Sequence, residues 1–289
     1  MIPGVFDYHA PASLEEALAL LGEHHDAKIL AGGQSLIPAM RFRLAQPANL
    51  IDINGLADLA YVREADGFLE IGALTREAEL EETALIARRY PLLHDATRVI
   101  ADPLVRNRAT VGGNLAHADP ANDHPAVMLA YGAQLVARGP GGERTIPVDD
   151  FFVGLFESSL QPGEILTAIR IPQPAAGSGG AYLKLERKVG DYAVSAVAVQ
   201  LEMDGATCRG ARIALTNVNP VPMRATDAEA AVAGRELTDE VGESAGKAAA
   251  AQCEPTADLR GSVEYKRDLT RVLTKRALRR AAERAGGAS

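Results

Sequence analysis

The sequence has little cysteine, few aromatic residues and no tryptophan. Its two cysteines, Cys208 and Cys253, are too few for an iron–sulfur cluster or a structural zinc site, which take about four ligands. The six histidines include no pair with a carboxylate at metal-ligand spacing. We therefore expect two reduced thiols and no metal site in this chain.

Long apolar runs and an excess of positive charge are also missing. No stretch approaches about 18 uninterrupted apolar residues, and the N-terminus lacks the charged and apolar regions of a signal peptide. With 30 Lys and Arg against 38 Asp and Glu, the net charge is −8, which disfavours a nucleic-acid partner. We expect a cytoplasmic protein, and the composition leaves open peripheral association with the inner face of the membrane.

What is present is ordinary globular composition with many glycines. The 289 residues are 47% hydrophobic and 24% charged, which is typical of a folded chain of one large domain or two modest ones. There are 27 glycines and few aromatic side chains. If this protein binds a ligand, we expect its backbone to supply much of the contact.

The N-terminal pattern predicts a small β-α-β-α-β unit that ends near residue 54. Ser13 and Glu16 form a capping box at the start of an amphipathic helix. The apolar segments 28–31 and 49–54 read as strands, and the glycine pair after the first of them marks a turn into a helix that begins near Ser35.

Two further blocks follow. The first contains predicted strands 68–73, 133–138 and 164–171 and helices 75–90 and 92–101, and it ends in a Pro/Gly/Ser-rich linker over 172–180. The second contains predicted strands 182–187, 195–203 and 208–218, then a helical tail broken at Gly234 and Gly242, with a last basic helix over 263–284. We expect one domain over 1–176, with subdomains of about 1–54 and 55–176, and another over 177–289.

The two glycine pairs, in Ala31–Ser35 (AGGQS) and Thr110–Asn114 (TVGGN), carry the most specific chemistry. Neither matches the usual nucleotide-binding glycine motifs. Without a Cβ, such pairs let successive backbone N–H groups approach an anion closely, and a following helix N-terminus adds positive potential. The matched pair predicts either a clamp for a diphosphate or two tight turns without a ligand.

Both motifs belong to longer segments, AGGQSLIPAM (31–40) and DPLVRNRATVGGNLAHADPANDHPA (102–126). These resemble the two flavin motifs in the FAD-binding medium subunit of molybdenum hydroxylases, the xanthine dehydrogenase family, and most of all its aerobic carbon monoxide dehydrogenase branch. Segments 184–193, 213–225 and 253–267 are similar as well, so the resemblance covers nearly the whole chain. It implies an α+β chain: an FAD-binding fold of the vanillyl-alcohol oxidase/p-cresol methylhydroxylase type, with two α/β subdomains, followed by a three-stranded antiparallel sheet with helices.

The resemblance also implies a division of labour. This chain would hold FAD and carry no catalytic residue of its own. A large partner subunit would carry the molybdenum cofactor, and a small one would carry two [2Fe–2S] clusters. The resemblance further implies a dimer of heterotrimers in which the flavin passes electrons to an acceptor such as a quinone.

The resemblance assigns cofactor contacts residue by residue. Asp123 would be a polar ligand after the second motif, Lys184 a polar contact near the flavin ring, and Tyr192 an aromatic residue stacked on that ring. The full set is Ile29, Leu30, Ala31, Gly32, Gly33, Gln34, Ser35, Leu36, Ile100, Thr110, Val111, Gly112, Gly113, Asn114, Asp123, Leu166, Lys184 and Tyr192.

Each of the later residues also has a purely structural interpretation. Asp123 could cap the helix that begins at His124, Leu166 and Tyr192 could be core residues, and Lys184 could extend along a strand edge toward water. His117, near the second motif, could approach the flavin or be a structural histidine.

The substrate of the assembly is left open by Gln34, which stands where carbon monoxide dehydrogenase medium subunits carry His. Gln at this position is common in relatives that act on aromatic or N-heterocyclic compounds. The alternatives to a carbon monoxide dehydrogenase-like subunit are therefore a subunit of such a hydroxylase, a stand-alone FAD oxidoreductase, or a non-catalytic nucleotide-binding module.

Overall fold

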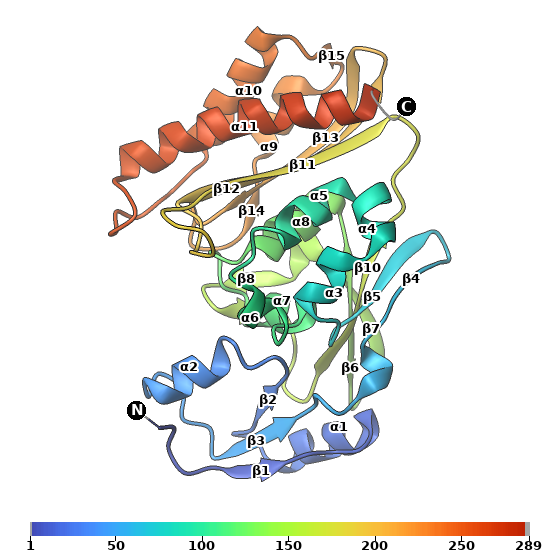
Figure 1. The fold of residues 1–289 in the computed structure, drawn as a ribbon, viewed down its shortest axis with the longest axis vertical. Helices are drawn as coiled ribbons and strands as arrows, with labels where there is room; N and C mark the ends of the chain where they lie inside the picture. The colour runs from blue at the N-terminus through green and yellow to red at the C-terminus, as the bar shows by residue number, and fades with distance from the viewer. Residues whose placement is uncertain (1, 287–289) are drawn as a thin grey trace.

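The computed structural model describes residues 2–286, beginning with a small parallel sheet at the bottom of Figure 1. Its strand order is β1-β3-β2, and both pairings are parallel. The β-α-β-α-β unit expected from the sequence is confirmed. Its elements are β1 (Asp7–His9), α1 (Leu14–Glu23), β2 (Lys28–Leu30), α2 (Leu36–Arg41) and β3 (Asn49–Asp52).

The capping box at α1 is also confirmed. Ser13 Oγ accepts a hydrogen bond from the N–H of Glu16 at 3.1 Å, and the Glu16 carboxylate accepts one from the N–H of Ala12 at 2.7 Å. The first bond satisfies a backbone donor that the first helical turn leaves without a partner. The second is shifted by one residue from a regular capping box, since it fixes the N–H of Ala12 and not that of the cap residue Ser13.

The middle of the chain builds a five-stranded antiparallel sheet of order β4-β5-β10-β6-β7. The strands are β4 (Val62–Ala65), β5 (Phe68–Gly72), β6 (Gln134–Gly139), β7 (Gly142–Pro147) and β10 (Ile165–Pro172). A two-stranded hairpin is separate: β8 (Phe152–Gly154) and β9 (Glu157–Ser158). The helices are α3 (Glu77–Glu82), α4 (Ala84–Arg89), α5 (Pro91–Thr97), α6 (Pro103–Arg106), α7 (Val111–His117) and α8 (Asp123–Tyr131), with short 3-10 turns η1 (Ala57–Leu59) and η2 (Val148–Asp150).

Three local expectations for this block are corrected. The helix predicted over 75–90 breaks at Thr83, which has extended backbone angles and separates α3 from α4. The helix predicted over 92–101 ends at Thr97. The glycines of the second motif do not form a turn but lie within the first turn of α7, because Thr110 caps that helix through a bond from the N–H of Gly113.

The C-terminal region is a second antiparallel sheet with helices on one face. The three predicted strands lie in the order β11-β12-β13, and two strands of two residues each, β14 and β15, both pair with β13 and extend the sheet to five. The elements are β11 (Ser178–Leu185), β12 (Ser195–Asp204), β13 (Thr207–Thr216), β14 (Met223–Arg224), α9 (Thr226–Val232), β15 (Arg235–Glu236), α10 (Asp239–Ala251) and α11 (Val263–Gly286).

Glycines account for two corrections in this region. Gly179 and Gly180, predicted as linker, lie inside β11, where an added Cβ would be 2.0 Å from Ala281 O of α11 and 2.8 Å from Leu92 Cβ of α5, respectively. Gly242 does not break the helical tail but is buried within α10. At Gly179 and Gly180 the missing side chain permits close packing rather than a bend. A Cβ on Gly242 would be in ordinary contact, 3.5 Å from Lys275 Cγ.

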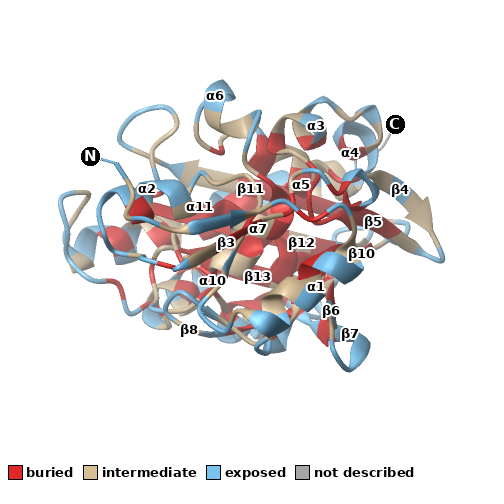
Figure 2. Ribbon diagram, turned by 90° about the horizontal axis from the view of Figure 1, so that it is seen from below, coloured by how far each residue is buried: buried red, intermediate tan, exposed pale blue. Residues whose placement is uncertain are grey.

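The elements stack in layers, as Figure 1 shows, with α9–α11 above the second sheet, α5 and α8 between the two antiparallel sheets, and the parallel sheet at the far end. The largest buried cluster crosses these layers: it includes Leu69 and Ile71 of β5, Leu115 of α7, Met128 of α8 and Ala196 of β12. Buried residues are concentrated in this interior (Figure 2). The α+β class is therefore confirmed, and the two larger regions share one core.

The described helices include none that is both long and apolar enough to cross a membrane. The longest, α11, carries charged residues along its whole length.

Candidate functional site

The first glycine motif forms an open loop between β2 and α2. Gly33 has φ of +76°, a left-handed conformation that favours glycine. The backbone N–H groups of residues 32–35 donate to no acceptor within the described part of the chain, and Ser35 makes no capping hydrogen bond to α2. Successive free N–H groups in such a loop form a concave site for an anion.

The second motif uses its backbone donors inside the protein. The N–H of Gly112 donates to Ala73 O at 2.9 Å, the N–H of Gly113 to Thr110 Oγ1 at 3.1 Å, and the N–H of Asn114 to Thr110 O at 2.9 Å. The two motifs therefore differ: the backbone N–H groups of the first are free, whereas those of Gly112, Gly113 and Asn114 in the second are used within the protein. The Asn114 side-chain oxygen is buried without a hydrogen-bond partner among the described residues.

The two motifs are in contact, although they are distant in the sequence. A Cβ on Gly32 would lie 2.3 Å from Arg108 O and 2.7 Å from Ala109 Cα. A Cβ on Gly113 would lie 3.6 Å from Ala31 Cβ. Only glycine at position 32 allows the free donors of the first loop to approach the second motif this closely.

Lys184 contacts Asp123, another of the later predicted residues. Its Nζ lies 3.0 Å from Asp123 Oδ2 and donates to Val99 O, next to Ile100 in the chain, at 2.9 Å. The side chain of Lys184 is 2% exposed, so it does not extend to water. Asp123 is not the α8 cap either, because the N-cap is Asn122. Asn122 instead donates from Nδ2 to Asn114 O at 2.9 Å, which links this cluster to the second motif.

Burial governs the electrostatics of the Lys184 cluster. Burial raises the pKa of Asp123, while the charge of Lys184 and the hydrogen bond from Tyr182 act in the opposite direction. The Tyr182 hydroxyl donates to Asp123 Oδ1 at 2.6 Å, and burial together with the Asp123 charge raises the pKa of Tyr182 well above its ordinary value. The arrangement pairs the buried Asp123 carboxylate with the Lys184 ammonium group, and Glu186 Oε2 lies 3.6 Å from the same Nζ.

Tyr192 lies on the exposed loop after β11 and is 43% exposed. The Arg260 guanidinium carbon is 5.9 Å from the centre of its ring and the Arg260 Nη2 donates to Asp191 Oδ1 at 2.7 Å. The pKa of Asp191 is lowered to about 2, and the hydrogen bond from Arg260 contributes most to this shift. The loop is further held by Gly190, where a Cβ would lie 2.9 Å from Ala101 O. An exposed, anchored aromatic ring is available to a ligand, unlike a core tyrosine.

Three more of the predicted residues are buried, and His117 is half-buried. Val111 is fully buried and Leu166 is 5% exposed, both within the main core, while Ile100 is 6% exposed. His117 is half-buried, with its ring centre 5.2 Å from that of Phe156, and burial lowers its pKa.

Two contributors were not predicted from the sequence. Tyr182 stands two residues before Lys184 on the same strand, and the two-residue period of a strand places both on one face, so that spacing was a usable signal. Asn122 lies inside the second motif segment, but its bond to Asn114 O depends on how α7 and α8 pack and has no local signature.

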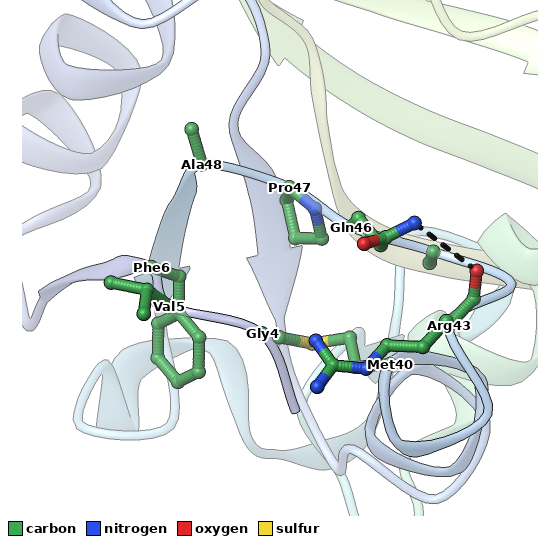
Figure 3. Close-up of a pocket in the computed structure, with 9 residues that line it drawn as sticks. Gly4, Val5, Phe6, Met40, Arg43, Gln46, Pro47 and Ala48 are labelled. Atoms are coloured by element: carbon green, nitrogen blue, oxygen red, sulfur yellow. Dashed lines mark hydrogen bonds between the residues drawn. The ribbon is translucent and has the colours of Figure 1, made fainter. Parts of the chain in front are cut away.

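A separate pocket of about 340 Å³ lies at the N-terminal region (Figure 3). Phe6, Met40 and Pro47 line it together with Arg43, whose carbonyl oxygen accepts a bond from Gln46 Nε2 at 3.4 Å. None of the predicted site residues lines this pocket, which lies between the N-terminal segment and the end of α2.

Comparison with known proteins gives two family matches. Residues 4–174 match the family described as FAD binding domain in molybdopterin dehydrogenase, and residues 180–281 match the CO dehydrogenase flavoprotein C-terminal domain. The carbon monoxide dehydrogenase medium chain of Hydrogenophaga pseudoflava is 47% identical over 96% of this chain and 97% of its own. A subunit of the 6-hydroxypseudooxynicotine dehydrogenase complex of Paenarthrobacter nicotinovorans is 40% identical over 99% and 97%.

A solved structure of carbon monoxide dehydrogenase from Hydrogenophaga pseudoflava is also similar. It superposes with a TM-score of 0.96 at 49% identity, covering 98% of this chain and 99% of the solved one. The family matches cover both regions of the chain, and the relatives match it over nearly its full length. The chain therefore belongs to the family of FAD-binding medium subunits of the molybdopterin dehydrogenases.

Proposed function

We propose that this protein holds FAD for electron transfer in a carbon monoxide dehydrogenase-like complex, with the diphosphate at the first glycine loop. The observation that carries the proposal is the row of free N–H groups at 32–35, beside a position that tolerates no Cβ. These groups suit a dianionic diphosphate because each supplies a hydrogen bond without a counter-ion.

The other residues of the site would contact the remaining parts of FAD. Thr110–Asn114 would form the opposite wall, with the unpartnered Asn114 oxygen available to a ligand hydroxyl or amino group. The paired Lys184 and Asp123 would present a polar contact beside Ile100, and Tyr192 would cover the ring system. When bound, FAD supplies two-electron storage between a one-electron donor and a final acceptor, while the chain binds and orients it.

The partners follow from the chemistry that this chain lacks. Cys208 and Cys253 are both buried, and each thiol donates to a backbone carbonyl of its own region. Neither is arranged as a cluster ligand, so the proposal assigns two [2Fe–2S] clusters to a small subunit and the molybdenum cofactor to a large one. It further assigns a dimer of heterotrimers and a quinone acceptor, which would bring the complex to the inner face of the membrane.

The proposal keeps the division into 1–176 and 177–289. It is supported by the end of β10 at Pro172 and the start of β11 at Ser178. Lys184 and Tyr192 would then come to the flavin from the C-terminal part and both glycine motifs from the N-terminal part.

The test is flavin content after purification of the full chain with its partner subunits. We expect FAD, identified by absorbance and by the mass of the released flavin, in an amount close to one per chain. Gly32→Ala should lose it, because the new Cβ would overlap Arg108 O. Gly22→Ala is the control, since a Cβ there meets nothing within 4 Å. A wild-type complex without FAD, or full flavin in Gly32→Ala, would contradict the proposal.

The second candidate is a subunit of an aromatic or N-heterocycle hydroxylase, favoured by the exposed Gln34 in the first loop and by the relative that acts in nicotine-related chemistry. Reduction of the purified complex by CO supports the first candidate, whereas reduction only by an N-heterocycle supports the second. Oxidation of an alcohol or phenol by the isolated chain would instead indicate a stand-alone enzyme.

A further inference from the structure

Arg76, which belongs to neither glycine motif, lies where the two motifs meet. It is the N-cap residue of α3 and forms an isolated antiparallel bridge with Thr110. Its half-buried guanidinium donates from Nη1 to Arg108 O at 2.5 Å and from Nη2 to Asn54 Oδ1 at 2.7 Å. The first of these acceptors is the carbonyl that faces Gly32.

Asn54 continues this connection to the first loop. Its Nδ2 donates to Ala31 O at 2.5 Å and lies 2.7 Å from Asp52 Oδ1, which also accepts from the N–H of Asn54. A single planar guanidinium therefore fixes the Arg108 carbonyl on one side and, through Asn54, the Ala31 carbonyl on the other. The rigid fork of arginine holds two acceptors at a set spacing in a way that a lysine ammonium cannot.

Among residues 2–286 no carboxylate forms a close ion pair with Arg76, although the charges of Glu79 and Asp52 act on it from a greater distance. Both of its hydrogen bonds go to neutral oxygens. Arg108 adds a second positive charge close by: burial, and then repulsion by Arg108, lower the pKa of Arg76. Positive charge and the free donors of residues 32–35 thus occur at the same junction, which suits a dianion.

We infer that Arg76 is a positioning residue for the diphosphate of FAD: it holds the two glycine motifs at the spacing that the anion needs and supplies positive charge beside the first loop. The inference rests on the proposed function, because it takes the first loop as the diphosphate site. It assigns Arg76 no part in the redox chemistry.

The experiment measures ligand affinity of the full chain freed of flavin, for wild type, Arg76→Gln, Arg76→Lys and the control Arg63→Gln. Arg63 is an arginine of the neighbouring strand β4 that pairs with Glu70 instead. The probes are FAD and ADP, which contain the diphosphate, and riboflavin, which does not. Thermal unfolding without ligand is recorded for each variant.

We expect Arg76→Gln to weaken FAD and ADP about 10- to 100-fold, the range for a hydrogen-bonded charge, with riboflavin unchanged. Arg76→Lys should be intermediate because it retains the charge without the fork, and Arg63→Gln should match wild type. Unchanged FAD and ADP affinity in Arg76→Gln would overturn the inference. An equal loss of all three ligands with a lower melting temperature would also overturn it, since that indicates a merely structural role.

If Arg76→Gln does not fold, Asn54→Ala tests the same connection without removing the charge. Selective weakening of FAD and ADP supports the inference, and wild-type affinities overturn it. A wild-type chain that binds neither FAD nor ADP would instead refute the proposed function, so the two failures are distinguishable.

Discussion

Lys184, Asp123 and Tyr182 show what single residues contribute to this site. They come from β11 and α8, and their polar atoms meet at 2.6 to 3.0 Å out of contact with water. Such a pair is weak evidence for stability as a whole, but the Asp123 carboxylate depends strongly on Lys184, because without that ammonium group it would be a buried charge that has lost its ion-pair partner.

Lys184→Met should therefore destabilise the protein by about 3–5 kcal/mol at neutral pH, measured by urea unfolding. The loss should shrink as the pH falls. Burial raises the pKa of Asp123 above its unfolded value, so the native state binds the proton more tightly and stability rises as the pH decreases through that range. The protonated carboxyl then needs no cation.

The double variant Lys184→Met/Asp123→Asn is the control, and it should lose less stability than Lys184→Met. A loss that is independent of pH, or an equal loss in the double variant, would show that the charge of Asp123 is not the cause.

At the residue scale, sequence patterns predicted features that depend on near neighbours. The Ser13 capping box and the glycine pairs are of this kind, since each involves residues a few positions apart. Arg76 was not predictable, because its partners Asn54 and Arg108 are distant in sequence and meet only after folding. The assignment of flavin contacts to individual residues stays a prediction.

At the scale of elements, glycine had three different structural roles that composition does not separate. Gly33 permits a left-handed loop, Gly112 fits the start of α7 against Ala73, and Gly179 lets α11 pack directly on β11. The sequence pattern identified three strands of the second sheet, but it read the glycines at the start of β11 as a linker. Their role depends on a helix that comes a hundred residues later.

Gly179→Ala tests that contact between α11 and β11. The new Cβ would lie 2.0 Å from Ala281 O, so the helix must move, and overpacking of this kind costs about 1–3 kcal/mol. We expect a lower melting temperature by differential scanning calorimetry. The matched control is Gly210→Ala on β13, where the nearest atom is Glu202 Oε2 at 3.9 Å; a comparable loss there would contradict the packing argument.

At the scale of the whole molecule, the N-terminal and C-terminal regions are tied by more than their linker. Asp95 on α5 accepts from Arg284 Nη1 at 2.6 Å and from Arg280 Nη2 at 3.2 Å, both on α11, and from the N–H of Tyr182. These bonds join α5 to the C-terminal helix α11, with 189 positions between Asp95 and Arg284, beside β11. The basic side chains of α11, Arg280 and Arg284, therefore contribute to contact within the chain.

Asp95→Asn should cost about 1.5–3 kcal/mol, the range for hydrogen bonds to a charged group. We expect lower stability in urea and faster proteolysis of the segment 173–177 between β10 and β11. Glu283→Gln removes the exposed ion pair with Arg279 on the same helix and should change stability by less than about 0.5 kcal/mol. Equal behaviour of the two variants would exclude Asp95 as a tie between the regions.

The first glycine loop belongs to a small sheet: among the described residues one of its faces buries Leu30, Met40 and Leu50, and the other joins a seven-residue cluster that reaches Leu74 and Ile165. The second motif is part of the larger shared core. A ligand held between the loop and the second motif therefore contacts a region with a small hydrophobic core and a region with a large one. Ligand binding then stabilises the region with the smaller core by mass action, and this stabilisation grows with the logarithm of the free ligand concentration. The cofactor would act as a mechanical brace for the first fifty residues as well as an electron carrier.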